Sequence, residues 1–485
     1  MKRKKTKIVA SVSDMRCDVD FIKQLRKAGM NVVRMNTAHA TQEGLKVLID
    51  NVRTVSNRIA ILIDTKGPEV RTTKIEEGKF EVSTGDIIRI VGKPEQMTTK
   101  ECIAVSYPLF VTDVPVGKEI LIDDGETALE VLSKEEDALV CKVLNDGEIG
   151  SRKSVNVPGV RINLPALTEK DKRNIQFAVE QDIDFVAHSF VRNASDVEAV
   201  RSLLGDSGIQ IIAKIENQEG VDNIDEIIEA ADGIMVARGD LAIEVPYNKI
   251  PGIQRMMIRK CVHAKKPIIV ATQMLHTMIK NPRPTRAEVA DIANAIYSRT
   301  DAVMLSGETA YGDYPVEAVK TMAEVAMQAE QDKVAENDIR IPLTDNADVT
   351  EFLAKQAVKS TYKLGNRAII TDSFSGRTAR NIAAFRGNCP VLAICYKEKT
   401  MRHLALSYGV DAIYMPELAD GQQYYFAGLR RLVESGELTN EDMVTYVSSG
   451  RVGQKPSFLE INQVGDVLEH ADNMVLPNKG RKITD

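Results

Sequence analysis

The chain has no tryptophan, and aromatic residues make up only 5% of it. It also lacks any apolar run of the roughly 20 residues that a membrane-spanning helix needs. The basic N-terminal segment MKRKKTK is followed by IVASVSD, which is too short and becomes polar too soon to be the core of a signal peptide. We therefore expect a protein that neither spans a membrane nor is exported.

Cysteine is scarce, and no C-x-x-C pair occurs. The six cysteines lie far apart, at positions 17, 102, 141, 261, 389 and 395. Scattered cysteines of this kind are typical of reduced thiols in a reducing compartment. The sequence therefore predicts a cytoplasmic protein without a disulfide framework.

An excess of basic residues is absent too. There are 63 Lys and Arg against 69 Asp and Glu, which gives a net charge of −6. This balance argues against a nucleic-acid-binding protein with a broad basic face. Small anionic ligands remain open, because they need only a few local cations.

The sequence does contain a repeating pattern of short β-rich apolar runs, each with a polar end and most followed by a helical stretch. The length of 485 residues predicts about three domains. Strands that alternate with helices indicate a parallel sheet, and a count of eight favours a closed (β/α)8 TIM barrel. The runs are 6–13, 31–38, 59–65, 184–190, 209–216, 233–240, 267–273 and 302–308.

The alternation is interrupted once, after the third run. Residues 73–160 are rich in β-branched residues and in turns at Gly and Asp-Gly, which predicts an inserted all-β domain placed over the barrel mouth as a lid. The barrel would then comprise residues 1–72 and 161–337. Residues 338–485 alternate again and predict a smaller, doubly wound α/β domain.

Polar side chains gather at the carboxyl ends of the predicted strands, where barrels of this type have their active sites. The period of two places Lys214 and Glu216 on one face, and Arg238 and Asp240 likewise. Each residue alone could be a solvated strand end or a structural ion pair, but the whole set predicts a site. Its members are Arg34, Asn36, Asp64, Thr65, Lys66, Ser189, Lys214, Glu216, Arg238, Asp240, Thr272, Ser306 and Glu308.

The residue types at this mouth favour metal-assisted chemistry on a phosphorylated substrate. Glu216 and Asp240 are hard carboxylate ligands from adjacent strands and suit Mg²⁺ or Mn²⁺. No Ser–His–Asp arrangement, Cys–His dyad or phosphate-binding G-x-x-x-x-G-K-[ST] loop occurs. Phosphoryl transfer and metal-dependent enolate chemistry both remain open. The cations expected to bind the substrate are Arg34, Lys66, Arg71 and Lys214.

Several longer motifs resemble the pyruvate kinase family. They are GMNVVRMNTAH, DTKGPEVRT, SVNVPG, INLPALTEKD, AKIENQEG, DGIMVARGDLAIEVP, ATQML, PRPTRAEVADIANAI and MLSGETAYGDYPVEAV. The resemblance runs from about residue 6 to 335 and is weaker in the C-terminal domain. It implies transfer of the phosphoryl group of phosphoenolpyruvate to ADP, which gives ATP and pyruvate in the last step of glycolysis and depends on Mg²⁺ (or Mn²⁺) and K⁺.

The resemblance also implies a role for each site residue. Glu216 and Asp240 would hold the divalent ion, Lys214 would stabilise the transferring phosphoryl group, and Thr272 would belong to the relay that protonates the enolate. Arg34 would be catalytic and would also bind substrate. The other substrate and nucleotide ligands would be Asn36, His39, Arg71, Lys153, Ser189 and the backbone of Ala237, Arg238, Gly239 and Asp240.

A potassium site is implied as well, with Asn36, Asp64 and Thr65 as its ligands. Ala38 departs from the family's serine, so that the missing oxygen would come from water or from Thr37. Within the family, a glutamate at the position of Glu69 goes with potassium dependence. The resemblance therefore implies activation by K⁺.

In the C-terminal domain, SFSGRTAR precedes a predicted helix and fits two interpretations. Ser375, Gly376, Arg377 and Thr378 could bind the phosphate of a sugar-phosphate activator, as the family often does there, or could simply cap the helix. The family also implies a homotetramer.

Two rival functions fit part of the pattern. A 2-oxoacid aldolase would use the same metal, but it would leave Lys153 and the lid unexplained. A non-catalytic sensor of phosphometabolites would not need Thr272.

Overall fold

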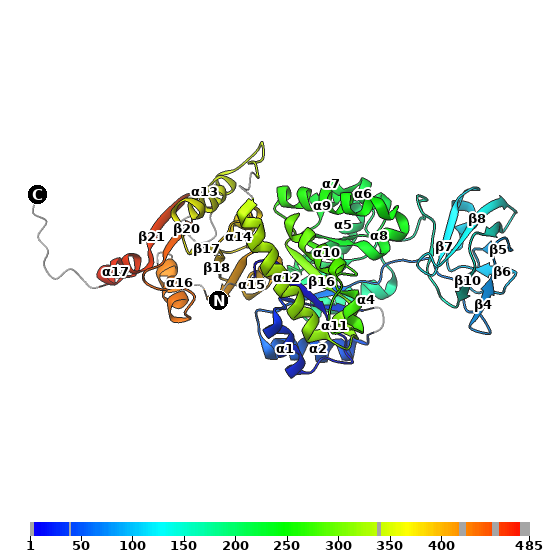
Figure 1. Cartoon of the computed structure of the whole chain (residues 1–485), viewed down its shortest axis with the longest axis horizontal. Helices are drawn as coiled ribbons and strands as arrows, with labels where there is room; N and C mark the ends of the chain where they lie inside the picture. The colour runs from blue at the N-terminus through cyan, green and yellow to red at the C-terminus, as the bar shows by residue number, and fades with distance from the viewer. Residues whose placement is uncertain (1–3, 38–39, 337–340, 417–422, 449–454, 476–485) are drawn as a thin grey trace, which may run out of the picture.

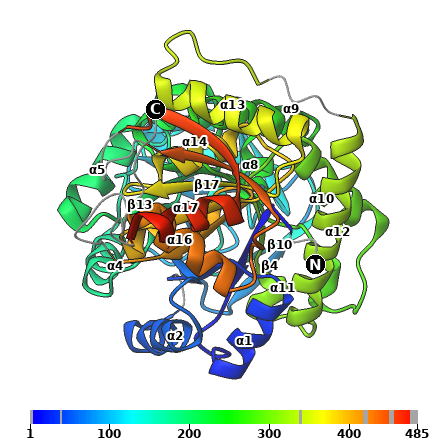
Figure 2. The same cartoon turned by 90° about the vertical axis from the view of Figure 1, so that its left-hand side faces the viewer.

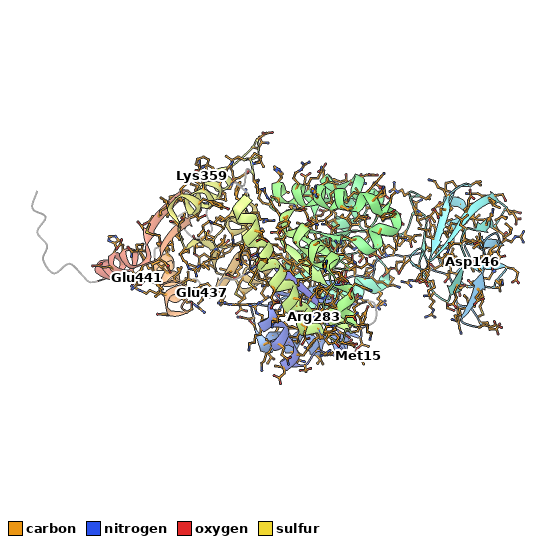
Figure 3. The ribbon with its side chains drawn as sticks, viewed as in Figure 1. Met15, Asp146, Arg283, Lys359, Glu437 and Glu441 are labelled. Carbon is orange, nitrogen blue, oxygen red and sulfur yellow. The ribbon has the colours of Figure 1, made fainter. Side chains whose placement is uncertain are left out.

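The computed structural model describes residues 4–37, 40–336, 341–416, 423–448 and 455–475. The described residues form a row of three bodies, with the barrel between the C-terminal domain and a β domain (Figure 1). Asp146 in the β domain and Glu441 in the C-terminal domain lie at opposite ends of the molecule (Figure 3).

Eight parallel strands close into a barrel in the order β1-β16-β15-β14-β13-β12-β3-β2. The predicted (β/α)8 architecture is confirmed. The strands are β1 Lys7–Ser11, β2 Val32–Asn36, β3 Ala60–Asp64, β12 Phe185–His188, β13 Gln210–Ile215, β14 Gly233–Ala237, β15 Ile268–Ala271 and β16 Ala302–Leu305.

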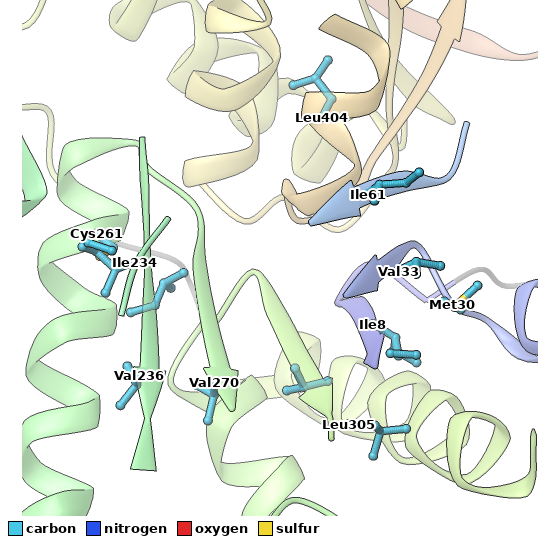
Figure 4. Close-up of a cluster of buried hydrophobic side chains, with 14 of the residues drawn as sticks. Ile8, Met30, Val33, Ile61, Ile234, Val236, Cys261, Val270, Leu305 and Leu404 are labelled. Carbon is cyan, nitrogen blue, oxygen red and sulfur yellow. The ribbon is translucent and has the colours of Figure 1, made fainter. Parts of the chain in front are cut away.

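Alternate strand residues face two different cores, because side chains of a strand have a period of two. Leu62, Phe185 and Ile212 belong to the cluster that fills the barrel interior. The strand residues that alternate with this set face outward, towards the surrounding helices. Ile61 of β3 and Val236 of β14 are two of them (Figure 4). The strands are therefore buried on both faces, as is usual for parallel sheets.

Several of the helices around the barrel start at a polar residue whose side chain caps the helix, namely α1, α2, α4, α5, α6 and α10. Thr168 and Asp171 form a capping box at α4, which joins the two residues reciprocally to the backbone at the helix start. Within the described ranges, no helix combines the length and the hydropathy needed to cross a bilayer. The helices are α1 Val19–Ala28, α2 Gln42–Val55, α4 Glu169–Glu180, α5 Ala194–Leu204, α6 Gln218–Asp222, α7 Ile224–Ala230, α8 Arg238–Glu244, α9 Ile250–Ala264, α10 Arg286–Tyr297, α11 Gly307–Ala310 and α12 Pro315–Glu336, with the short 3-10 helices η1 Gly205–Ser207, η2 Tyr247–Lys249 and η3 His276–Ile279.

Two predicted strands run into helices: in the run 302–308, β16 ends at Leu305 and Glu308 lies in α11, and the run 233–240 is the second case. The sequence run 233–240 was expected to be extended throughout, but β14 ends at Ala237 and Arg238 begins α8. The expectation that Arg238 and Asp240 share a strand face is therefore wrong. Asp240 lies in the first turn of a helix instead.

The β domain is inserted between β3 and α4 and packs around its own core, which includes Ile90, Phe110 and Leu129. It contains a two-stranded sheet, β10-β4, and a six-stranded sheet, β11-β7-β8-β9-β5-β6. The predicted all-β insertion is confirmed, with the addition of one short helix. Its elements are β4 Lys79–Val82, β5 Ile87–Val91, β6 Cys102–Ala104, α3 Phe110–Asp113, β7 Glu119–Ile122, β8 Thr127–Lys134, β9 Leu139–Val143, β10 Gly147–Gly150 and β11 Val155–Asn156.

The C-terminal domain has a five-stranded sheet of order β19-β18-β17-β20-β21, in which only β21 is antiparallel to its neighbour. Helices α13 and α14 lie on one side of this sheet and α16 and α17 on the other (Figure 2). The predicted doubly wound fold is confirmed. The elements are α13 Val349–Leu364, β17 Ala368–Ser373, α14 Arg377–Ala384, β18 Val391–Cys395, α15 Glu398–His403, η4 Leu404–Leu406, β19 Val410–Tyr414, α16 Gln423–Glu434, β20 Met443–Ser448, β21 Phe458–Gln463 and α17 Val464–Val475.

The C-terminal domain is joined to the barrel by buried charges and by one apolar side chain. Asp184, at the start of β12, is fully buried and accepts hydrogen bonds from Arg402 Nε (2.5 Å) and Arg53 Nη2 (3.0 Å). Leu406 belongs to the same cluster as the residues inside the barrel. A side chain of the C-terminal domain therefore completes the barrel core.

Candidate active site

Five polar side chains meet directly at the carboxyl ends of the barrel strands, and we call them the mouth cluster: Arg34, Asp64, Ser189, Lys214 and Glu216. The ammonium of Lys214 is at their centre. Its Nζ lies 2.7 Å from Ser189 Oγ, 2.8 Å from Glu216 Oε1 and 3.4 Å from Asp64 Oδ1. The expectation that Lys214 and Glu216 point the same way is consistent with this contact.

Asp64 connects Lys214 to Arg34. Its Oδ2 accepts a hydrogen bond from Arg34 Nε (2.8 Å), and a second guanidinium nitrogen also contacts it. Arg34 Nη1 donates to Ser11 Oγ (3.1 Å), a residue of β1 that the sequence reasoning did not select. Ser11 could have been found, because it too is a polar residue at the carboxyl end of a strand.

Burial and neighbouring charges shift the ionisation of this cluster. Burial by itself raises the pKa of Asp64, but the charges of Arg34 and Lys214 outweigh it and hold that pKa below its ordinary value. Burial likewise lowers the pKa of Lys214, but Asp64 and Glu216 outweigh it and raise that pKa above its usual range. Lys214 therefore stays charged at neutral pH.

The negative charge of Glu216, in contrast to the charges of Asp64 and Lys214, is only partly compensated by its neighbours. Burial raises its pKa, the charge of Asp240 raises it further, and Lys214 only partly opposes both. Its Oε2 accepts the Phe190 N–H (2.6 Å). Two repelling carboxylates, Glu216 directly after β13 and Asp240 in the first turn of α8, favour a cation between them.

The residues fit a divalent cation held by few protein ligands. In the described part of the chain, no three His, Cys, Asp or Glu side chains gather as a metal site. Glu216 and Asp240 together provide only two carboxylate ligands. The Asp240 carboxylate makes no hydrogen bond to a described residue and is therefore available to a metal ion. Mg²⁺ commonly uses one or two carboxylates and completes its shell with water and substrate oxygens. The donor set therefore suits Mg²⁺ or Mn²⁺.

Thr272 lies beside the start of α8. It has φ +69°, an unusual conformation for a β-branched residue and one found at functional sites. Its Oγ1 accepts the Gly239 N–H (2.8 Å) and donates to Ala271 O (2.6 Å). The hydroxyl is thus linked to the loop between Ala237 and Asp240.

The Arg238 side chain is directed into the barrel wall. Its guanidinium binds Asp291 (2.7 Å and 2.8 Å) and donates to Thr272 O (2.6 Å). The side chain is thus engaged within the barrel, which leaves the backbone of Arg238 for the substrate contact that the resemblance implies.

The expected potassium ligands lie at the ends of two neighbouring strands. Asn36 and Asp64 are register partners on β2 and β3, and Thr65 follows Asp64 directly. Thr37 Oγ1 donates to Asp64 O (2.7 Å), which brings this hydroxyl to the same place. Ala38 and the expected nucleotide ligand His39 lie outside the described residues.

Arg71 and Lys153 lie at the junction between the barrel and the β domain, and each is paired with an acidic residue. Arg71 Nε donates to Glu69 (2.7 Å), which Lys66 also approaches (3.8 Å). Lys153 Nζ is 2.5 Å from Asp123 in the β domain. Neither cation touches the mouth cluster in this arrangement of the domains.

A crevice of about 400 Å³ runs along this junction and reaches Asp240. Phe190 lines the crevice, and its backbone N–H donates to the Glu216 carboxylate. Asn156 of β11 donates to Glu244 of α8 (3.3 Å), and both residues line the crevice. The crevice therefore reaches Asp240 and Phe190, whose backbone N–H is bound to Glu216.

One predicted site residue, Glu308, serves the backbone, and Asp171, which is not among the predicted residues, supports the site. Glu308 accepts hydrogen bonds from Leu275 N (3.0 Å) and Ser306 N (2.7 Å), so it joins two strand ends instead of facing the mouth. Asp171, which was not selected, accepts the Lys66 N–H (2.9 Å) and holds the loop after β3. Its signal is the capping sequence TEKD.

The candidate effector loop lies at the start of α14, far from the mouth. Gly376 has φ +79° and its N–H donates to Ser373 Oγ (2.9 Å). Arg377 is already paired with Asp348 (2.8 Å). The loop residues are Ser375, Gly376, Arg377 and Thr378.

Comparison with known proteins identifies the family. The family model "Pyruvate kinase, barrel domain" matches residues 3–319, and "Pyruvate kinase, alpha/beta domain" matches residues 351–459. The chain belongs to the pyruvate kinase family. Transfer of a phosphoryl group from phosphoenolpyruvate to ADP, the activity expected from the sequence, is the activity of this family.

Individual pyruvate kinases match over nearly the whole chain. The pyruvate kinase of Borreliella burgdorferi is 45% identical over 96% of this chain and 98% of its own length. That of Geobacillus stearothermophilus is 44% identical over 96% of this chain and 81% of its own length. A crystal structure of a pyruvate kinase from Cryptosporidium parvum superposes with a TM-score of 0.89 at 36% identity, covering 95% of this chain and 96% of that one. These matches favour the kinase over the aldolase.

Proposed function

We propose that the mouth cluster, with Asp240 and Thr272, is where this pyruvate kinase family member transfers the phosphoryl group of phosphoenolpyruvate to ADP. One observation supports this above all: Lys214 Nζ lies within 3.4 Å of Ser189, Glu216 and Asp64. A fixed ammonium in a buried site stabilises charge as it develops, without reorganisation.

In this proposal the phosphoryl oxygens contact Lys214 and Arg34, and Ser189 Oγ orients the lysine. Both cations are pre-positioned by Asp64, which lowers the cost of ordering them when substrate binds. The substrate carboxylate binds the backbone of residues 237–240. Thr272 Oγ1 relays a proton from water to the enolate carbon and so regains the proton it gives, and its bond to Gly239 keeps it beside the bound carboxylate.

Glu216 and Asp240 hold a divalent ion, Mg²⁺ or Mn²⁺. When bound, this ion neutralises negative charge on the substrate oxygens. Arg71, Lys153, Asn36 and His39 serve the nucleotide. Closure of the β domain over the mouth excludes water and brings Lys153 to the phosphates.

A coupled assay with phosphoenolpyruvate, ADP, Mg²⁺ and K⁺ tests the proposal. We expect ATP and pyruvate to form in equal amounts, and no pyruvate without ADP. Pyruvate release that does not need ADP would instead indicate a lyase-type or hydrolytic reaction, and no turnover would indicate a sensor.

Activation by K⁺ is a further expected result. Asn36, Asp64 and Thr65 provide oxygens at one place, and Thr37 adds a hydroxyl beside them. Replacing K⁺ by tetramethylammonium at equal ionic strength should lower kcat by roughly tenfold or more, because the bulky cation cannot enter an oxygen site of this kind. Equal rates in the two salts would contradict the potassium site.

Two expectations from the resemblance stay predictions. They are phosphate binding by residues 375–378, where Arg377 would have to leave Asp348, and assembly into a homotetramer.

A further inference from the structure

His188, the last residue of β12, is a buried histidine to which the proposed chemistry gives no role. Only 1% of it is exposed. Phe185 and Ala187 belong to the cluster inside the barrel, whereas Val186 faces the helices outside. By the same alternation, His188 points outward, behind the mouth cluster.

The two ring nitrogens of His188 are in different situations. Nδ1 lies 3.4 Å from Thr65 Oγ1, whereas Nε2 is buried and has no hydrogen-bond partner among the described residues. The nearby carboxylates are committed elsewhere: Asp196 binds Arg192, and Asp171 binds Lys66 N. His188 is therefore not part of a buried ion pair, and an orphaned polar atom of this kind calls for an explanation.

The direction of the bond between His188 and Thr65 depends on the tautomer of the ring, and the other hydrogen bond of Thr65 favours Nδ1 as the acceptor. Thr65 Oγ1 already accepts the Ser189 N–H (3.0 Å), so its own proton needs an acceptor, and Nδ1 is the neighbour that can take it. In a neutral ring that carries its proton on Nε2, Nδ1 is free to accept this proton. The hydroxyl of Thr65 is therefore held in one orientation.

This contact is connected to Lys214 through Ser189. The Ser189 backbone is held by Thr65 Oγ1, its Oγ donates to Thr65 O (2.7 Å), and the same Oγ accepts a bond from Lys214 Nζ (2.7 Å). A fixed orientation of the Thr65 hydroxyl therefore fixes the position of Ser189, whose Oγ accepts the hydrogen bond from the Lys214 ammonium. It also orients Thr65, one of the expected potassium ligands.

We propose that His188 is a positioning residue: by accepting the Thr65 hydroxyl proton, it orders Ser189 and Thr65 for Lys214 and for the monovalent cation. The inference deepens the proposed function and rests on it. His188 does not touch substrate, and it acts only through Thr65.

Two substitutions separate this role from simple packing. In His188→Asn, Oδ1 takes the place of Nδ1 and still accepts the Thr65 proton, whereas His188→Ala removes the acceptor. We expect His188→Ala to lower kcat about tenfold and to raise the half-activating K⁺ concentration about fivefold, with His188→Asn within about twofold of the parent protein. Melting temperatures of both variants, measured without substrate, serve as the folding control.

A double-mutant cycle with Thr65→Val completes the test. Because His188 acts through the Thr65 hydroxyl, adding His188→Ala to Thr65→Val should lower kcat by less than about twofold further. Independent, multiplying effects, a His188→Ala variant with the parent kcat and K⁺ dependence, or a His188→Asn variant as impaired as His188→Ala would each overturn the inference. A parent protein that shows no K⁺ activation would contradict the potassium site alone, and the cycle in kcat would still decide the role of His188.

Discussion

Replacing Lys214 by methionine should lower kcat by about a thousandfold, which corresponds to about 4 kcal/mol of lost transition-state stabilisation. Methionine keeps the length and the apolar stem but removes the charge that lies against Ser189, Glu216 and Asp64. Steady-state kinetics at saturating phosphoenolpyruvate, ADP, Mg²⁺ and K⁺ would measure the effect.

The change should fall mainly on kcat, because an ammonium directed at developing charge acts more in the transition state than in the bound substrate. Lys172→Met, at an exposed lysine of α4 paired with Glu169, is the matched control and should leave kcat unchanged. A loss of less than about tenfold in the Lys214 variant would remove this residue from the centre of the mechanism.

Replacing Glu216 by glutamine should weaken divalent-ion binding and activity together. Glutamine has nearly the same shape and can still accept the Phe190 N–H, but it removes one of the two charges that bind the ion. We expect the half-saturating Mg²⁺ concentration to rise at least about tenfold and kcat to fall about a hundredfold. Mg²⁺ titrations of initial rate would measure both.

Glu308→Gln is a demanding control for the metal prediction. Glu308 is another buried glutamate, in α11 just after β16, but its oxygens accept hydrogen bonds from the backbone amides of Leu275 and Ser306. This variant should keep the Mg²⁺ dependence of the parent protein even if it melts at a lower temperature. A Glu216→Gln variant with unaltered Mg²⁺ dependence would show that Glu216 is not a ligand.

Much of the barrel and its mouth could be predicted from the sequence because the relevant signals are local. Strands marked by β-branched runs and polar ends place Asp64, Lys214 and Thr272 at one end of a parallel barrel. The period of two was reliable for Lys214 and Glu216, which belong to one extended segment. It failed for Arg238, since α8 begins there and a helix has a different period.

Other features depend on contacts between segments far apart in the chain, and these leave little trace in the sequence. Nothing local shows that Glu308 is used by the backbone of another strand end, or that Arg238 binds Asp291 on α10. The same holds for His188, whose interest lies in an unpartnered nitrogen that only the packing of β12 against its neighbours reveals.

The Leu406 side chain has a consequence for how this protein can be divided or recombined. Leu406 of the C-terminal domain packs against the apolar side chains inside the barrel. Removing that domain would therefore expose these side chains to solvent. A chimera with the C-terminal domain of a relative would have to keep a side chain of the same shape as Leu406 and also the ion pair between Arg402 and Asp184. The packing of the barrel therefore depends on a side chain of the C-terminal domain, although the proposed catalytic residues all lie in the barrel.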